Sequence, residues 1–401
     1  MNFELNEEHK MFQQSLRELM EKEFGPIVDE RDKQGPLTRD EAIDIMKKLK
    51  KVGVGLDNES IEDLLDPMMF GIIAEEIGRV WPSILTLFGM GAIPAIFVPA
   101  ASEEVRERLL PKLEKGEFIG CFAETEPEAG CDTSNLSTKA RLDGDHYIIN
   151  GNKSWISNAT IADTAFVGAK DEETGNPLFF LIEKEISPFE TTESHKIGWK
   201  ASPTGEIFFD DCRVPKENEL TFLLENAFAS DALIIPDGLM NLITTMTPIT
   251  AMLTIPRAGM GLSSVGIAQA AFDASVKYAR ERIQFGKPIG KFQLIQEMLY
   301  EMDVMIETAR LLSYKAMTFI VNGHPEARKY SAMAKAYGGE VAQKVTDKAI
   351  QIHGGMGLSE EMPIERYFRD ARVMTIPDGT TEIMKLITGY SILGKGFSAY
   401  S

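Results

Sequence analysis

The sequence predicts an α+β protein in which a helical segment, a β segment and a second helical segment follow one another. Three observations predict this order. Apolar residues recur at three- and four-residue spacing up to about residue 117, short apolar runs separated by turn residues come next, and helical spacing returns from Arg257. Helices and strands do not alternate along the chain, which argues against a doubly wound parallel sheet.

The composition is that of an ordinary globular protein with a strong negative charge. The 401 residues are 44% hydrophobic and 26% charged, and 42 Lys and Arg against 61 Asp and Glu give a net charge of −19. We therefore expect neither nucleic acid nor an anionic membrane as a partner, because both require a basic face. The N-terminus is acidic where a signal peptide is basic, so we expect a cytoplasmic protein without membrane insertion.

Residues 1–117 are predicted to form an N-terminal helical domain, with Pro26, Pro36 and Pro82 at breaks between helices. Residues 118–220 are predicted to form a middle β domain. Its expected strands are Phe118–Phe122, Tyr147–Ile149, Ala165–Val167, Leu178–Ile182 and Ile207–Phe209, with hairpin or loop connections at Asp143–Asp145, Asn150–Gly151 and Thr174–Asn176.

Residues 221–256 form an apolar connecting insertion without a single basic residue. Its uncharged run from Gly238 to Pro256 contains prolines and threonines, so we interpret it as buried or pocket-lining rather than membrane-spanning. Residues 257–401 are predicted to form a C-terminal helical bundle. Small residues such as Ala258, Gly261 and Gly266 would let its first helix approach a neighbour closely.

Several classes of site are disfavoured. Three cysteines cannot build a disulfide framework, and five dispersed histidines offer no metal-ligating pair, so we expect no protein metal site. No glycine-rich dinucleotide motif, P-loop or nucleophile elbow is present. An enzymatic activity would therefore depend on a cofactor held by another scaffold.

Four segments carry unusual residue combinations, and each also has a plain structural interpretation. Cys121–Asp132 is either a ligand loop or a strand-to-loop junction, and Asn150–Asn158 contains Trp155, which a β unit can use structurally. Arg280–Ile289 resembles an ordinary helix C-cap. Gln351–Gly357 has adjacent glycines that permit close backbone approach, whereas the following Arg-rich helix is either functional or a solvated face.

Taken together, in order and spacing, these segments resemble the acyl-CoA dehydrogenase family over essentially the whole chain. The matching motifs are Thr125-Glu126-Pro127-Glu128-Ala129-Gly130, Asn150-Gly151-x-Lys153-x-Trp155-Ile156-Ser157-Asn158, Gly198-Trp199-Lys200-Ala201-Ser202, Arg282-x-x-Phe285-Gly286-x-Pro288, Gln351-x-x-Gly354-Gly355-x-Gly357 and Tyr367-x-Arg369-Asp370-Ala371.

The resemblance implies a helical N-terminal domain, a middle β domain and a C-terminal four-helix bundle. It also implies a homotetramer with FAD between the β domain and the bundle, and an electron-transferring flavoprotein as electron acceptor. By position, the implied flavin-side contacts are Phe122, Glu124, Thr125, Gly130, Cys131, Trp155 and Ser157, together with Thr380 and Glu382. The implied contacts to the FAD of a neighbouring subunit are Arg282, Phe285, Gln351, Ile352, His353, Gly354 and Gly355.

The implied substrate contacts are Cys131, Arg257, Asp378 and Gly379, with Asp378 as the catalytic base. Family members commonly have a Glu at this place, so Asp378 keeps the carboxylate on a side chain one methylene shorter. Some members place the base directly before the helix arginine instead, where this chain has Pro256. Glu124 stands where an aliphatic residue is usual and adds a second carboxylate, and Cys131 replaces the usual Ser.

We therefore expect FAD-dependent α,β-dehydrogenation of an acyl-CoA whose acyl group is cyclic, branched or aryl-substituted. The short base and the unusually long, apolar insertion before Arg257 motivate that expectation about the substrate. Two alternatives remain open, namely an enoyl-CoA reductase that runs the reverse reaction and a non-catalytic homologue that binds FAD or CoA.

Overall fold

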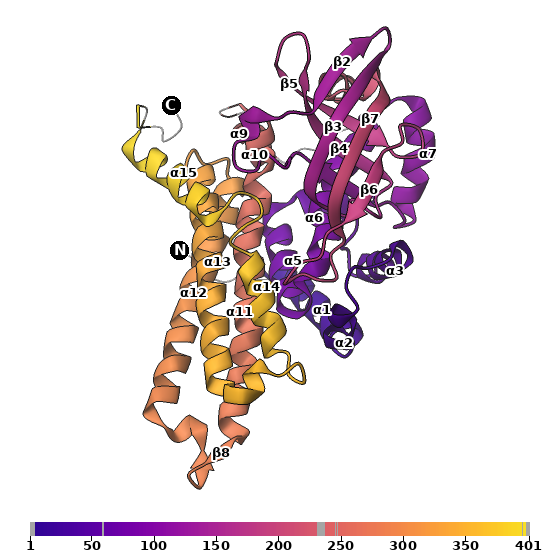
Figure 1. The fold of residues 1–401 in the computed structure, drawn as a ribbon. Coiled ribbons are helices and arrows are strands. Elements are labelled where there is room, and N and C mark those ends of the chain that lie inside the picture. The colour runs from indigo at the N-terminus through magenta and orange to yellow at the C-terminus, as the bar shows by residue number, and fades with distance from the viewer. Residues whose placement is uncertain are drawn as a thin grey trace.

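The computed structural model describes residues 5–57, 60–230, 237–244, 246, 248–394 and 396–397. The bundle forms a long column on one side of the molecule, and the β sheet and N-terminal helices lie on the other (Figure 1). The predicted α+β order is confirmed. The N-terminal helices are α1 (Glu7–Leu19), α2 (Val28–Lys33), α3 (Arg39–Lys50), α4 (Ser60–Leu65), α5 (Pro67–Val80), α6 (Leu85–Phe97) and α7 (Glu103–Glu114).

An apolar stretch, Pro82–Ala100, contributes much of the core of the N-terminal domain. Among the described residues, Pro82–Ala100 alone is long and apolar enough to cross a membrane, but 72% of it is buried inside the protein. Its helix α6 packs directly on β1, so closely that a Cβ on Gly120 would lie 2.3 Å from Pro94 Cγ. This stretch therefore behaves as a core helix that supports the first strand of the sheet.

The middle domain is one sheet whose strands lie in the order β1-β4-β2-β3-β7-β6, with β5 beside β4. The strands are β1 (Gly120–Ala123), β2 (Lys139–Asp143), β3 (His146–Ser157), β4 (Thr164–Asp171), β5 (Pro177–Glu183), β6 (Glu190–Glu193) and β7 (Thr204–Pro215). The predicted turn at Thr174–Asn176 joins antiparallel β4 and β5. Strands β2 and β6 were not predicted, because they are polar and lack the short apolar runs from which the other strands were predicted.

The predicted connection at Asn150–Gly151 is wrong, because these residues lie inside β3. The pairing of β3 with β7 shifts between Ile149 and Gly151, as in a β-bulge. Gly151 has φ +144°, and a Cβ there would lie 2.7 Å from the backbone of Thr138 on the neighbouring chain segment. The glycine signals an irregular strand here, since both bulges and turns use its conformational freedom.

The insertion contains α8 (Leu220–Ser230), α9 (Asp237–Ile243) and α10 (Pro248–Met252), and its residues 231–236, 245 and 247 lie outside the described residues. Helices α9 and α10 lie at the bundle, on its side toward the sheet (Figure 1), whereas α8 packs on β5 and on residues 98–100 after α6. Leu223, Leu242 and Ala251 are buried in the core that the insertion shares with the N-terminal helices, and Met246 and Met252 are partly buried against it.

The C-terminal bundle consists of α11 (Thr254–Glu281), α12 (Gln293–Val321), α13 (Ala327–His353), α14 (Ile364–Val373) and α15 (Thr381–Leu393). A hairpin of β8 (Ile283–Gln284) and β9 (Lys287–Pro288) connects α11 to α12. The small residues of α11 let neighbouring helices approach closely, as predicted. A Cβ on Gly261 would lie 2.9 Å from the Ala334 carbonyl of α13, and one on Gly266 would lie 2.2 Å from the Glu75 carbonyl of α5.

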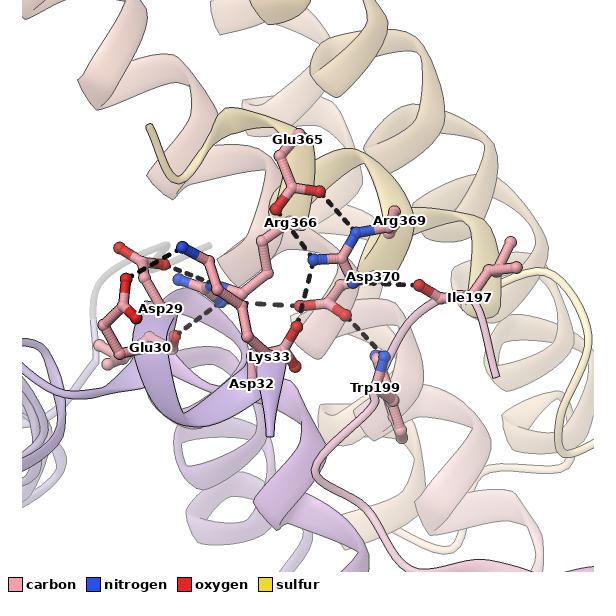
Figure 2. Close-up of polar contacts among 11 residues, drawn as sticks. Asp29, Glu30, Asp32, Lys33, Ile197, Trp199, Glu365, Arg366, Arg369 and Asp370 are labelled. Atoms are coloured by element: carbon pink, nitrogen blue, oxygen red, sulfur yellow. Dashed lines mark hydrogen bonds and ion pairs between the residues drawn. The ribbon is translucent and has the colours of Figure 1, made fainter. Parts of the chain in front are cut away.

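A polar network joins all three domains at α14 (Figure 2). Arg366 donates to Asp29 of α2 at 2.8 Å, and Arg369 donates to Asp32 of α2 at 3.1 Å and to the Ile197 carbonyl at 3.0 Å. Asp370 accepts from the Trp199 N–H at 2.7 Å. Arg366 is only 3% exposed, so the Arg-rich helix is an interdomain connector rather than a solvated face.

Candidate active site

The candidate base lies in a tight turn between α14 and α15, where two cations hold two consecutive carbonyls. Arg257 of α11 donates from Nε to the Asp378 carbonyl at 3.0 Å. Lys335 of α13 donates from Nζ to the Gly379 carbonyl at 2.6 Å. Asp378 has φ +58° and Gly379 has φ +93°, so both residues are in conformations that L side chains rarely adopt. The bundle thus holds the turn in a strained conformation.

The charges around Asp378 oppose the effect that burial has on its pKa. Burial raises the pKa of the Asp378 carboxyl, and the positive charges of Lys335 and Arg257 oppose that rise. Burial lowers the pKa of Lys335 to about 8, against the attraction of Asp378. A raised pKa makes this carboxylate a stronger proton acceptor, as a general base requires, and the two nearby cations favour its ionised form.

The β domain contributes the segment that follows β1, and a buried ion pair fixes it. Lys153 of β3 and Glu126 are both fully buried, with Nζ 2.7 Å from Oε1. Lys153 also donates to the Glu124 carbonyl at 3.0 Å, and the Ser154 N–H donates to the Thr125 carbonyl at 2.9 Å. Two residues of the motif around Trp155 therefore anchor the segment that contains Glu124 and Thr125.

Glu126 completes this anchor with bonds to its own loop. Its carboxylate accepts from the N–H and hydroxyl of Ser137 and from the N–H of Thr138. Burial alone would raise the pKa of Glu126, but these bonds and the one from Lys153 outweigh it and lower the pKa to about 2. Each carboxylate oxygen of Glu126 therefore accepts from two donors, and the pair is a buried structural element.

Glu124 brings a second carboxylate to the same region. Burial raises the pKa of Glu124, and the charges of Lys153 and Arg257 oppose the rise. Arg257 therefore interacts electrostatically with both Glu124 and Asp378, which come from different domains. Cys131 is exposed and close enough to Lys335 to affect its pKa. Glu124, Cys131, Arg257 and Asp378, which the family resemblance implies as flavin or substrate contacts, are thus close enough to interact directly or through Lys335.

The flavin-side residues present a surface that fits an aromatic ring with polar edges. Trp155 is 64% exposed with φ +61°, so it is not the packed structural tryptophan that was the alternative interpretation. Within the described part of the chain, the hydroxyls of Thr125 and Ser157 have no hydrogen-bond partner, and a Cβ on Gly130 would meet open space. Unpaired hydroxyls beside an exposed indole suit the carbonyls, nitrogens and plane of an isoalloxazine.

Phe122, Thr380 and Glu382 have structural contacts of their own. Phe122 is partly buried and stacks on Phe166 and Phe179, with centroid distances of 6.4 and 6.5 Å. Thr380 is the N-cap of α15 and accepts from the Ile383 N–H, and Glu382 lies in the first turn of that helix. The N-terminus of α15 therefore begins directly after the Asp378–Gly379 turn.

The remaining predicted cofactor residues gather at the other end of the bundle. The β8–β9 hairpin projects from the tip of the bundle, away from the sheet (Figure 1). Phe285 at its turn is 92% exposed, and Arg282, Gln351, Gly354 and Gly355 are also exposed. Ile352 and His353 are instead buried within the bundle, where His353 stacks on Tyr278 at a centroid distance of 4.3 Å. This separation is the one expected if these residues contact the FAD of another subunit.

Lys335 is the site residue that sequence reasoning missed. A single lysine in a long amphipathic helix gives no local signal, since most such lysines are solvated. Only the packing of α13 against the turn before α15 shows that it is buried. In the described residues no group of three His, Cys, Asp or Glu side chains is arranged to hold a metal ion.

Three consecutive family models match the chain. The N-terminal domain of acyl-CoA dehydrogenase matches residues 6–117, the middle domain matches residues 121–212, and the C-terminal domain matches residues 246–393. They correspond to the helical, β and helical parts described above.

Relatives match over nearly the full length. The chain is 34% identical over 402 residues to a glutaryl-CoA dehydrogenase of Desulfococcus multivorans, covering 98% of each chain. A structure described as the electron transferring flavoprotein of Acidaminococcus fermentans matches with a TM-score of 0.83 and 32% identity, over 98% of this chain and 100% of the other. An acyl-CoA dehydrogenase from Bacillus anthracis complexed with FAD matches with a TM-score of 0.80 and 28% identity, over 99% of this chain and 68% of the other. The chain therefore belongs to the acyl-CoA dehydrogenase family of FAD-dependent oxidoreductases.

Proposed function

We propose that Asp378 is the base that removes the α-proton of an acyl-CoA during its α,β-dehydrogenation. Bound FAD supplies the hydride acceptor for the β-hydrogen, so the thioester loses two electrons and becomes an enoyl-CoA while its α-proton passes to the carboxylate. The observation that carries the proposal is the Asp378 carboxylate on a strained turn held by Arg257 and Lys335. A non-catalytic homologue would not need to keep a carboxylate there.

The chain's own residues account for the remaining requirements of this reaction. Burial raises the pKa of the base, and the exclusion of water by a bound acyl group would strengthen hydrogen bonds to the developing enolate. Arg257, at the start of α11 and attracted by both Glu124 and Asp378, would bind the CoA portion, as the family resemblance implies. Trp155, Thr125 and Ser157 present the surface for the flavin ring. The reverse reaction, enoyl-CoA reduction, would use the same groups.

We further propose that the acyl group is cyclic, branched or aryl-substituted near its α and β carbons. The shorter side chain of Asp378 leaves room beside the α-carbon. Helices α9 and α10 lie between the sheet and the bundle, and the insertion contributes Met246 and Met252, whose flexible side chains adapt to a bulky group.

A panel of thioesters tests the substrate proposal. Cyclohexanecarboxyl-CoA or a methyl-substituted succinyl-CoA should reduce the flavin with higher kcat/KM than butyryl-, octanoyl- or glutaryl-CoA. Asp378→Glu should improve the reduction by butyryl-CoA and impair that by the preferred ester, because the longer carboxylate fills the added space. The highest kcat/KM with butyryl- or octanoyl-CoA, and none with the cyclic or branched esters, would refute the proposal.

We propose a cytoplasmic homotetramer with one FAD per subunit that passes its electrons to an electron-transferring flavoprotein. Two observations support assembly. The predicted FAD residues occupy two distant ends of one subunit, and α12 exposes Tyr300, Val304 and Leu311, whose four- and seven-residue spacing puts them on one face of the helix. Exposed apolar rows of this kind are typical of subunit interfaces.

Dissociation of the oligomer should therefore release FAD. Dilution in mild urea, followed by separation by size, should yield monomers without flavin absorbance, because Arg282, Phe285 and Gln351–Gly355 would no longer reach the cofactor. Arg282→Gln should lower the flavin content of the intact oligomer, whereas Arg141→Gln, at an exposed arginine of β2, should not. Monomers that keep full flavin occupancy would contradict the assignment across subunits.

A further inference from the structure

Among the residues that the structure describes, two lysines are fully buried, and they differ in how their charge is balanced. Lys153 has Glu126 at 2.7 Å. In the described part of the chain, Lys335 has no carboxylate in ion-pair contact, and its hydrogen bond goes to the Gly379 carbonyl at 2.6 Å. Burying an ammonium group without an adjacent carboxylate is costly, so its position calls for an explanation beyond packing.

The groups that face Lys335 come from every element around the turn. Asp378 in the turn and Glu382 of α15 attract its charge, Cys131 from the loop after β1 does so when ionised, and Arg257 of α11 repels it. Lys335 and Arg257, from two different helices, donate hydrogen bonds to consecutive carbonyls of one left-handed turn. A charge so placed acts on the carboxylate of Asp378 without forming an ion pair that would block it.

We propose that Lys335 is a positioning residue for the candidate base, holding the Gly379 carbonyl and keeping the Asp378 carboxylate ionised. The proposal rests on the proposed function only in taking Asp378 as the base. Without Lys335, burial acts on the carboxyl group with Arg257 alone to oppose it. The pKa of Asp378 then rises, and the pH below which the base is protonated and inactive rises with it.

The test measures the titration of Asp378 directly, without substrate. In the FAD-loaded protein, pH-dependent infrared difference spectra contain a carboxylic acid band of Asp378, identified by its absence from the Asp378→Asn variant. Lys335→Met should move the midpoint of this band upward by about one pH unit or more, the effect of removing a nearby opposite charge. Lys335→Arg should return it close to the parent value, because an arginine keeps the charge.

Lys196 provides a matched control. It also donates to a backbone carbonyl, that of Ser202 at 2.7 Å, and burial likewise lowers its pKa to about 8. Lys196→Met should leave the Asp378 midpoint unchanged. If Lys335→Met does not fold, Lys335→Gln, which can still donate an N–H but has no charge, should show the same upward shift. An unchanged midpoint in the uncharged variants would overturn the proposal.

A measurement of flavin reduction distinguishes a failure of the role of Lys335 from a failure of the base assignment. If Asp378→Asn reduces flavin at the parent rate while Lys335→Met still shifts the infrared band, the base assignment fails and the role of Lys335 toward Asp378 stands. If Asp378→Asn is slow and the band does not move, the base assignment stands and the role of Lys335 fails.

Discussion

Asp378→Asn should fold, keep its FAD and reduce that flavin at least about a hundredfold more slowly than the parent, as expected for the loss of a general base. Asparagine tolerates the left-handed conformation that residue 378 adopts, so the turn and its bonds to Arg257 and Lys335 should persist. Asp378→Ala also removes the carboxylate and should be as slow, but alanine lacks the tolerance of asparagine for the left-handed conformation, so Asp378→Asn is the cleaner variant. Stopped-flow flavin absorbance with the best thioester of the panel gives the rate.

Asp211 is the matched control for this substitution. It has φ +45°, lies exposed on β7 and bonds to Asn150 rather than to any site residue. Asp211→Asn should leave the rate unchanged. If Asp378→Asn reduces flavin at the parent rate, the base lies elsewhere, and Glu124→Gln then becomes the decisive variant, since Glu124 is the other carboxylate beside Arg257.

Lys153→Met should destabilise the protein by about 3–5 kcal/mol, the usual effect of removing one partner of a buried ion pair. Glu126 would remain buried and charged, and the Glu124 carbonyl would lose its donor. The segment that presents Thr125 to the flavin would then loosen, so FAD content should fall as well. Chemical denaturation and flavin absorbance per subunit measure the two effects.

The combination with Glu126→Gln tests whether the charge itself is responsible. The double variant Lys153→Met, Glu126→Gln should regain part of the stability, because no unpaired buried charge remains. Lys47→Met, which removes an exposed lysine paired with Glu117, should barely move the transition. If Lys153→Met kept the stability and the full FAD content of the parent, the ion pair would not be what holds the flavin-side segment.

The local pattern of residues along the chain was enough to predict the order of helical and β segments and the family. Helical spacing and short apolar runs are properties of neighbouring residues, so the α, β, α order was readable, as was the turn between β4 and β5. Motif order and spacing indicated the family and FAD. Polar strands escaped prediction, because β2 and β6 are recognised by the partners with which they pair and not by their own residues.

Only the tertiary structure shows which charged residues are buried and which groups they bind. The sequence left Arg366 open between a functional and a solvated helix face, and packing against α2 placed it in an interdomain network. Lys335 had no local signal, yet α13 brings it against the Asp378–Gly379 turn. The physical reason is that the environment of a charge depends on groups distant in sequence, whereas periodicity reports only on a residue's own element.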